Sequence, residues 1–221
     1  MLWFEKVPVC SILMDSVWGT AYCGSRRKRE DCIMKNILYI DSCINRAHSR
    51  TERLARAYLR KRRESGDVLD VIVLEEADLQ PLNEERLSYR ERSISEGDFS
   101  DPFFDHAKRF AAADELVIAA PFWDFSFPAM LKIFLELICV RDLTFRYTET
   151  GGVANLTKLT SVTYITTAGG YIAPDNCACD YIRKLCSGLF GVEQFRFISA
   201  QGLDICGNDP EKILSGVIDS F

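Results

Sequence analysis

From Asn36 onward, short apolar runs alternate along the chain with longer stretches in which apolar residues recur at helical spacing. Such runs predict strands over 36–41, 68–74, 115–120, 159–166 and 193–200. The first run ends at polar residues, and the second is rich in β-branched residues. Helical spacing predicts helices over about 49–65, 101–113, 127–140 and 180–190, with a short one after Asp209-Pro210. Residues 75–98 are polar and charged without strong periodicity, so we predict an irregular excursion there.

The alternation of strands and helices predicts one α/β domain. Strands that alternate with helices form βαβ units, which build a parallel sheet with helices on both faces. The run 115–120 is nearly all apolar, as expected for a strand covered on both faces. Only Lys132 and Glu136 interrupt the apolar surface of the helix predicted over 127–140, so we expect it in the core or across a subunit interface, with Ser126 as its cap.

The first 33 residues do not share this pattern. Glu5 and Asp15 interrupt what would be a signal peptide, and the basic cluster 26–29 follows the apolar part instead of preceding it. We therefore expect no secretory signal, and we divide the chain into an N-terminal extension, 1–33, outside the fold, and a domain, 34–221. Two explanations stay open for the extension: a start codon upstream of the native one, or a genuine, loosely attached arm.

Composition excludes several classes of protein. The chain has 221 residues, a net charge of -5 and 48% hydrophobic residues, which is typical of a soluble globular protein. It lacks the basic balance of a nucleic-acid binder and the roughly 18 consecutive apolar residues of a membrane span. The 9 cysteines cannot all pair, so we expect reduced thiols in the cytoplasm. No metal site is expected, since Cys177, Cys179 and Cys186 have no histidine nearby.

Candidate chemistry follows the first predicted strand. In open α/β sheets, ligands bind beyond the carboxyl ends of the strands. The loop 41–51 leads into a helix and places the hydroxyls of Ser49 and Thr51 beside the guanidinium of Arg50 and the free amides of the helix start. This set suits a terminal phosphomonoester, whereas the lack of any glycine argues against a triphosphate or dinucleotide loop. Alternatively, Ser49 only caps the helix.

Two further loops complete the candidate site. The loop 121–128 carries large aromatic residues that could lie along a planar ring, or could instead be buried under a partner subunit. The loop 166–171 contains Gly169 and Gly170, which let the backbone approach a ligand closely, and Tyr171, which could cover it; a plain turn is the alternative. A phosphate cradle, an aromatic loop and a glycine loop at three strand ends together predict a flavin mononucleotide (FMN) site.

On these motifs the chain resembles the FMN-dependent NADH-azoreductase and NAD(P)H:quinone oxidoreductase family. The resemblance rests on S-R-T at 49–51, A-A-P at 119–121 followed by F-W-D-F, T-F-R-Y-T-E-T-G at 144–151 and the glycine loop at 167–170. It covers about residues 35–206, and the F-R-Y-T-E-x-G string is its most specific part. It implies a flavodoxin-like three-layer sandwich with a five-stranded parallel sheet in the order 2-1-3-4-5, and a homodimer with FMN bound noncovalently near the subunit boundary.

The resemblance also implies a set of site residues. Carried over by position, the FMN-binding residues are Cys43, Ser49, Arg50, Thr51, Phe122, Trp123, Asp124, Phe125, Thr167, Ala168, Gly169 and Gly170. Tyr147 and Tyr171 are candidate substrate contacts. No side chain is expected to be catalytic, because the flavin carries the chemistry: NADH or NADPH reduces it and leaves, and a small acceptor such as a quinone or azo compound then takes two electrons.

Three residues depart from the family pattern. Cys43 stands where a serine is frequent, Asp124 replaces an amide residue and can only accept hydrogen bonds when ionised, and Ala168 replaces a bulkier residue. Two rival functions agree less well with the sequence. A non-catalytic flavodoxin-type electron carrier is disfavoured by the F-R-Y-T hairpin and the apolar helix 127–140. A receiver-type regulator would use Asp41, but the acidic cluster and the lysine that it needs are not evident.

Overall fold

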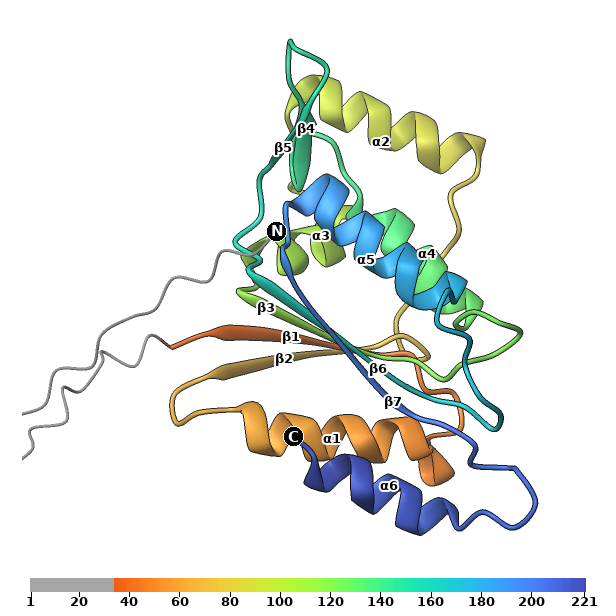
Figure 1. Cartoon of the computed structure of the whole chain (residues 1–221). Coiled ribbons are helices and arrows are strands. Elements are labelled where there is room, and N and C mark those ends of the chain that lie inside the picture. Colours follow the sequence, from red (N-terminus) through yellow and green to blue (C-terminus); the bar gives the residue numbers. More distant parts are fainter. Residues whose placement is uncertain (1–33) are drawn as a thin grey trace, which may run out of the picture. The chain divides into compact units, whose positions relative to one another are not determined.

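A five-stranded parallel sheet organises residues 34–221, the part of the chain described by the computed structural model (Figure 1). The strands lie in the order β2-β1-β3-β6-β7, which is 2-1-3-4-5 among the strands of this sheet, so the predicted topology is confirmed. The N-terminal extension predicted for 1–33 lies outside the described residues. The five strands are β1 (Asn36–Asp41), β2 (Val68–Val73), β3 (Glu115–Ala119), β6 (Ser161–Thr167) and β7 (Gln194–Ala200).

Helices cover both faces of the sheet (Figure 1). One face is covered by α1 (Arg50–Arg62) and α6 (Pro210–Asp219), and the other by α3 (Asp105–Ala112), α4 (Ala129–Ile138) and α5 (Cys177–Phe190). β3 shows why the middle strands are apolar throughout: Leu116 and Ile118 join the core under α3, α4 and α5, whereas Val117 and Ala119 join the core under α1 and α6. Alternate side chains of one strand therefore fill two cores.

The segment 75–98 was predicted to be irregular, and this prediction is wrong for most of it. It contains helix α2 (Glu84–Glu96), capped by the side chain of Asn83, which accepts from the amide of Arg86, and ended by Gly97 in the left-handed region at a φ of 68°. Only Ser93 and Ile94 of this helix are buried. The inward face of α2 also includes the half-buried Arg86, Tyr89 and Arg90, so this face is mostly polar and shows no apolar period. The caps of α2 and its charged helix-forming residues define it instead.

Two helix starts also differ from the predictions. Ser126 does not cap α4, because its amide and carbonyl both pair with Trp123 in a tight turn, and α4 begins at Ala129 without a side-chain cap. The helix predicted from 180 begins earlier, at Cys177, because Asn176 accepts a hydrogen bond from the amide of Cys179. Both differences arise from local hydrogen bonds that the apolar pattern does not record.

Three small elements lie outside the sandwich of sheet and helices. Two are short 3-10 helices, η1 (Arg46–His48) before α1 and η2 (Pro102–Phe104) before α3. The third is the antiparallel hairpin of β4 (Phe145–Tyr147) and β5 (Val153–Asn155), built from the F-R-Y-T segment.

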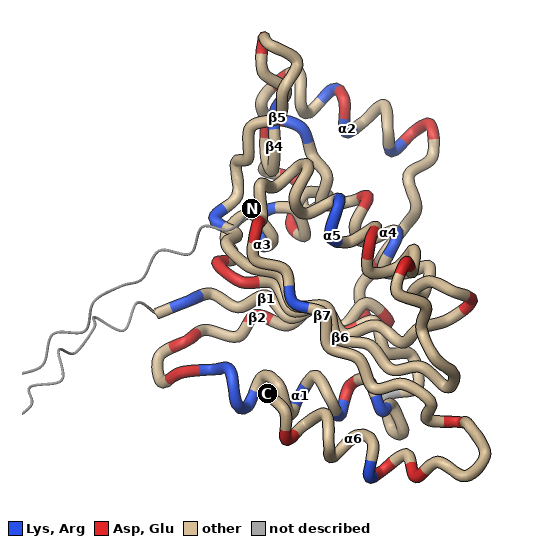
Figure 2. The backbone as a smooth tube through the Cα atoms, viewed as in Figure 1, with Lys and Arg blue, Asp and Glu red and all other residues tan. Residues whose placement is uncertain are grey.

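Charged residues lie mainly on the helices and loops, and the middle strands carry few (Figure 2). This distribution agrees with strands that are buried on both faces. None of the helices between residues 34 and 221 combines the length and the apolar character that crossing a bilayer requires.

Candidate cofactor-binding site

The first loop ends in a capped helix. The Oγ atom of Ser49 accepts a hydrogen bond of 3.1 Å from the amide of Glu52, so the capping role considered for Ser49 is present. This bond uses an oxygen lone pair and leaves the hydroxyl hydrogen free to donate to a ligand. The amides of Arg50 and Thr51, in the first turn of α1, have no acceptor within the helix. Helix start and cap therefore offer donors and a positive dipole end to an anion.

A buried hydroxyl pair joins the first loop to the third. The Oγ1 atoms of Thr51 and Thr167 lie 2.6 Å apart, although the two residues are 116 positions apart in the sequence. Both residues are buried, at 1% and 8% exposure. One hydroxyl hydrogen lies between the two oxygens and the other remains to be donated, so the pair can both hold the loops together and contact a phosphate.

The second loop is a strained turn that exposes aromatic side chains. Trp123 and Ser126 exchange two backbone hydrogen bonds, and the residues between them, Asp124 and Phe125, have positive φ angles of 48° and 63°. Aspartate tolerates this region, but a bulky phenylalanine there is uncommon and strained. The turn leaves Trp123 46% and Phe125 82% exposed at the carboxyl edge of the sheet. Such strain is frequent where a fold presents side chains to a ligand.

The third loop pairs with the chain that follows β7. The amide of Leu203 donates to the carbonyl of Ala168, and the amide of Asp204 donates to the carbonyl of Gly169. A Cβ atom on Gly169 would collide with the carboxylate of Asp204, so a larger residue there would have to displace that side chain. The second loop joins the same assembly, because the amide of Phe122 donates to the carbonyl of Thr167. The three predicted loops therefore meet at one edge of the sheet.

Asp204 also lies at these loops, and no motif in the sequence indicates it. Its carboxylate lies 2.7 Å from the guanidinium of Arg50 and connects the start of α1 to the end of β7. The only signal in the sequence was its position after the last strand, since ligand-binding loops follow strand ends. Both side chains are partly exposed, at 36% for Arg50 and 68% for Asp204, so this ion pair is weak and a phosphate can compete for the guanidinium.

Tyr147, a predicted substrate contact, does not lie at these loops in the described chain. It lies on β4, and the hairpin packs near the far end of α5, where Asn155 approaches Gly191. Figure 1 shows the hairpin at the other end of the domain from the loops that follow β1, β3 and β6. Tyr171, by contrast, follows the third loop and lies over Gly202, where an added Cβ would be 3.2 Å from its ring.

Cys43 lies in the first loop, but it is not a reactive thiol. It is 2% exposed, its Sγ atom approaches the carbonyl of Ala119 at 3.8 Å, and its amide donates to Asp41. Burial raises the pKa of this thiol far above its usual range, and burial also raises the pKa of Cys186 to about 12. Both thiols therefore stay protonated at neutral pH.

We expect iodoacetamide at pH 8 to modify the exposed Cys177 and Cys206 at least about tenfold faster than Cys43 and Cys186, because only an accessible thiolate reacts. Mass spectrometry of peptides from the briefly treated native protein measures the four rates. Unfolding in urea should equalise them. Rapid alkylation of Cys43 in the native protein would contradict the buried, neutral thiol.

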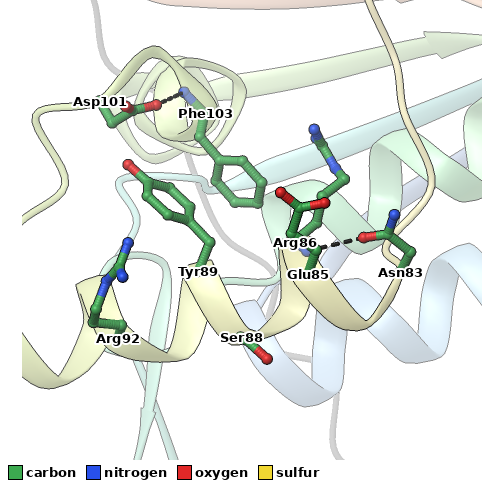
Figure 3. Close-up of a pocket in the computed structure, with 8 residues that line it drawn as sticks. All are labelled: Asn83, Glu85, Arg86, Ser88, Tyr89, Arg92, Asp101 and Phe103. Carbon is green, nitrogen blue, oxygen red and sulfur yellow. Dashed lines mark hydrogen bonds between the residues drawn. The ribbon is translucent and has the colours of Figure 1, made fainter.

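A separate hollow lies between α2 and η2 and shares no residue with the three loops (Figure 3). Its volume is about 630 Å³. The guanidinium of Arg86 stacks over the ring of Phe103 at 4.9 Å, and that of Arg92 stacks over Tyr89 at 5.3 Å. The contact between Arg86 and Phe103 joins α2 to η2, as does the edge-to-face contact of Tyr89 with Phe103 at 5.5 Å, whereas Arg92 and Tyr89 both lie on α2.

Comparison with known proteins agrees with this geometry. A family model described as flavodoxin-like fold matches residues 35–220. An FMN-dependent NADH:quinone oxidoreductase of Coprothermobacter proteolyticus is 35% identical over 192 residues, covering 82% of this chain and 94% of that protein. FMN-dependent NADH:quinone oxidoreductase 2 of Clostridium acetobutylicum is 32% identical over 193 residues, covering 84% of this chain and 96% of that protein.

Solved structures show the same fold. An azoreductase from Bacillus anthracis superposes with a TM-score of 0.72 at 17% identity, covering 85% of this chain and 96% of that one. An FMN-dependent NADH-azoreductase from the same species, in complex with FMN, gives a TM-score of 0.71 at 20% identity over 85% of this chain and 95% of that one. On the family match and the two sequence relatives, the chain belongs to the flavodoxin-like family that includes the FMN-dependent NADH:quinone oxidoreductases.

Proposed function

We propose that this protein is an FMN-dependent oxidoreductase that passes two electrons from NADH or NADPH, through bound flavin, to a quinone, an azo compound or a similar small acceptor. The observation that carries the proposal is the meeting of a phosphate-type loop, an aromatic turn and a glycine loop at one sheet edge. The relatives that are named for this activity align with this chain over nearly their whole length. The order of events is ping-pong, with the nicotinamide leaving before the acceptor binds.

The donors at the start of α1 fit the phosphate of FMN. Ser49 and Thr51 offer hydroxyl hydrogens, Arg50 offers a guanidinium, and the first-turn amides face the same anion. Cys43 lies alongside, but its neutral, buried thiol is only a weak donor. The helix start and its hydroxyls would therefore hold the phosphate.

The exposed aromatic turn fits a planar ring. Phe122, Trp123, Asp124 and Phe125 would line the ribityl chain and the isoalloxazine, and the third loop, Thr167, Ala168, Gly169 and Gly170, would line the other edge of the ring. The rings of Phe122 and Phe125 meet edge to face at 6.5 Å, which holds part of the turn in place. FMN supplies the two-electron chemistry when bound, while these side chains orient the ring and exclude water from one side of it. An ionised carboxylate at Asp124 accepts hydrogen bonds only, so it would not donate to a carbonyl of the flavin.

We also propose that the protein is a cytoplasmic homodimer in which each site receives a tyrosine from the other copy. Tyr147 is 63% exposed on a hairpin that lies far from the loops of its own chain. It can therefore approach an acceptor only at the site of a second copy, whereas Tyr171 serves its own site. The 6 cysteines between residues 34 and 221 are all free thiols, which supports a reducing compartment.

The purified protein is expected to be yellow, with a flavin absorbance band near roughly 450 nm, and to oxidise NADH or NADPH with menadione and with an azo dye as acceptors. Absorbance spectroscopy and turnover at about 340 nm provide the measurements. Bound FMN without turnover would favour the electron-carrier alternative. Colourless protein that takes up no added FMN would refute the proposed function.

A further inference from the structure

A groove separate from the three loops runs between α1 and the edge strand β2. Its volume is about 410 Å³, within the range of small-molecule pockets. Its floor is apolar: Leu69, Val71 and Val73 alternate along β2 on the side that faces Leu59 of α1. β2 has a neighbour on one side only, β1, so the groove opens at the edge of the sheet, and Val71 remains 43% exposed.

Arginines form the rim of this groove. Arg56 and Arg60 are one turn apart on α1, Arg63 follows directly after the helix, and all three line the groove. Arg56 is bound by Glu52, and Arg63 donates to the carbonyl of Asp67. Arg60 has no ion pair or hydrogen bond with any other residue between 34 and 221. Its charge is the one on the rim still available to a ligand.

Tyr39 contributes a second unused group. Its ring lines the groove at the level of Val71, its partner in the strand register, and its hydroxyl has no hydrogen-bond partner within residues 34–221. The residue is 3% exposed. Burial raises its pKa, so the hydroxyl keeps its hydrogen and can act as a donor. Buried polar groups are almost always paired in folded proteins, so a buried donor at a groove indicates a missing acceptor.

The side chains of Arg60 and Tyr39, together with the apolar floor of the groove, indicate the chemical class of the ligand. The free guanidinium of Arg60 and the hydroxyl of Tyr39 favour an anion that accepts hydrogen bonds. The apolar floor favours a ligand whose remaining part is apolar. The carboxylates of Asp41 and Glu52 lie with Arg56 at the carboxyl end of the groove, so the ligand's negative head should lie toward Arg60. We propose that this groove binds a small amphipathic carboxylate, with its head between Arg60 and Tyr39 and its alkyl chain along Leu69 and Val71.

Titration of the full-length protein with decanoate, by calorimetry, tests this proposal, with FMN present in excess. We expect saturable binding of one decanoate per chain. Arg60→Gln should weaken it about tenfold, since a charge-assisted bond is lost, and Tyr39→Phe should weaken it several-fold, by roughly one neutral hydrogen bond. Val71→Glu, a change at an exposed position, should abolish it. Decanol, which has no charge, should bind at least about tenfold more weakly.

Arg53→Gln is the matched control, because Arg53 lies on the same helix but pairs with Glu211 of α6, away from the groove. It should bind decanoate as the wild type does. Unchanged FMN affinity and thermal unfolding would show that each variant is folded. No saturable binding by the wild type, or binding that survives both Arg60→Gln and Val71→Glu, would overturn the proposal. Neither result bears on the flavin site, which is tested by absorbance and turnover.

Discussion

Replacing Arg50 by alanine is expected to weaken FMN binding about 10- to 100-fold, because a hydrogen bond to a charged group contributes about 1.5–3 kcal/mol. The guanidinium lies at the start of α1 beside Ser49 and Thr51, where the phosphate is proposed to bind. Fluorescence titration of the flavin-free protein measures the affinity. Riboflavin, which has no phosphate, is the internal control: its affinity should be nearly the same in wild type and variant.

The partner of Arg50 gives the opposite expectation. In the structure this guanidinium donates a hydrogen bond of 2.7 Å to the carboxylate of Asp204, which forms an ion pair with it. Asp204→Asn removes the competing charge, so FMN should bind somewhat more tightly, by about the 0.2–1 kcal/mol of an exposed ion pair. If Arg50→Ala weakens riboflavin as much as FMN, Arg50 supports the loop but does not hold the phosphate.

Replacing Phe110 by alanine is expected to lower the free energy of unfolding by about 3–5 kcal/mol. Phe110 is completely buried and its ring meets that of Phe190 at 4.7 Å, so it joins α3 to α5 over the sheet. The change removes this contact and leaves a cavity that the surrounding helices fill only partly. Urea denaturation of flavin-free protein measures the loss as a lower midpoint at an unchanged slope.

Phe125 provides a matched phenylalanine-to-alanine control. It is 82% exposed and strained at positive φ, so its replacement should change the free energy of unfolding by no more than about 0.5 kcal/mol while impairing flavin binding. A loss below about 1 kcal/mol for Phe110→Ala would show that the core under α3 and α5 collapses around the missing ring.

The pattern of apolar residues predicted the strands of the sheet but did not predict helix α2. Strands such as 115–120 were recognisable because burial on both faces demands an uninterrupted apolar run. α2 was missed because the side of it that packs carries mainly polar residues, and only Ser93 and Ile94 of it are fully buried, so no apolar period marks it in the sequence. Asn83 and Gly97, at its ends, were the available signals. Ser126 was assigned to a cap, but the turn it makes with Trp123 depends on positive φ angles that sequence does not reveal.

The sequence by itself determined the five strands, the helix start at Ser49 and the identity of the loops that follow β1, β3 and β6, because these depend on local periodicity and on motifs of a few residues. The strand order was expected only from the resemblance to a known family, and the structure confirms it. Only the tertiary structure decided which groups meet. Thr51 and Thr167 are joined across 116 positions, and Arg50 and Asp204 across 154. The same folding leaves Tyr147 far from its own loops and Tyr39 buried without a partner within residues 34–221. Such relations depend on how a parallel sheet brings distant strand ends together, and no local pattern records them.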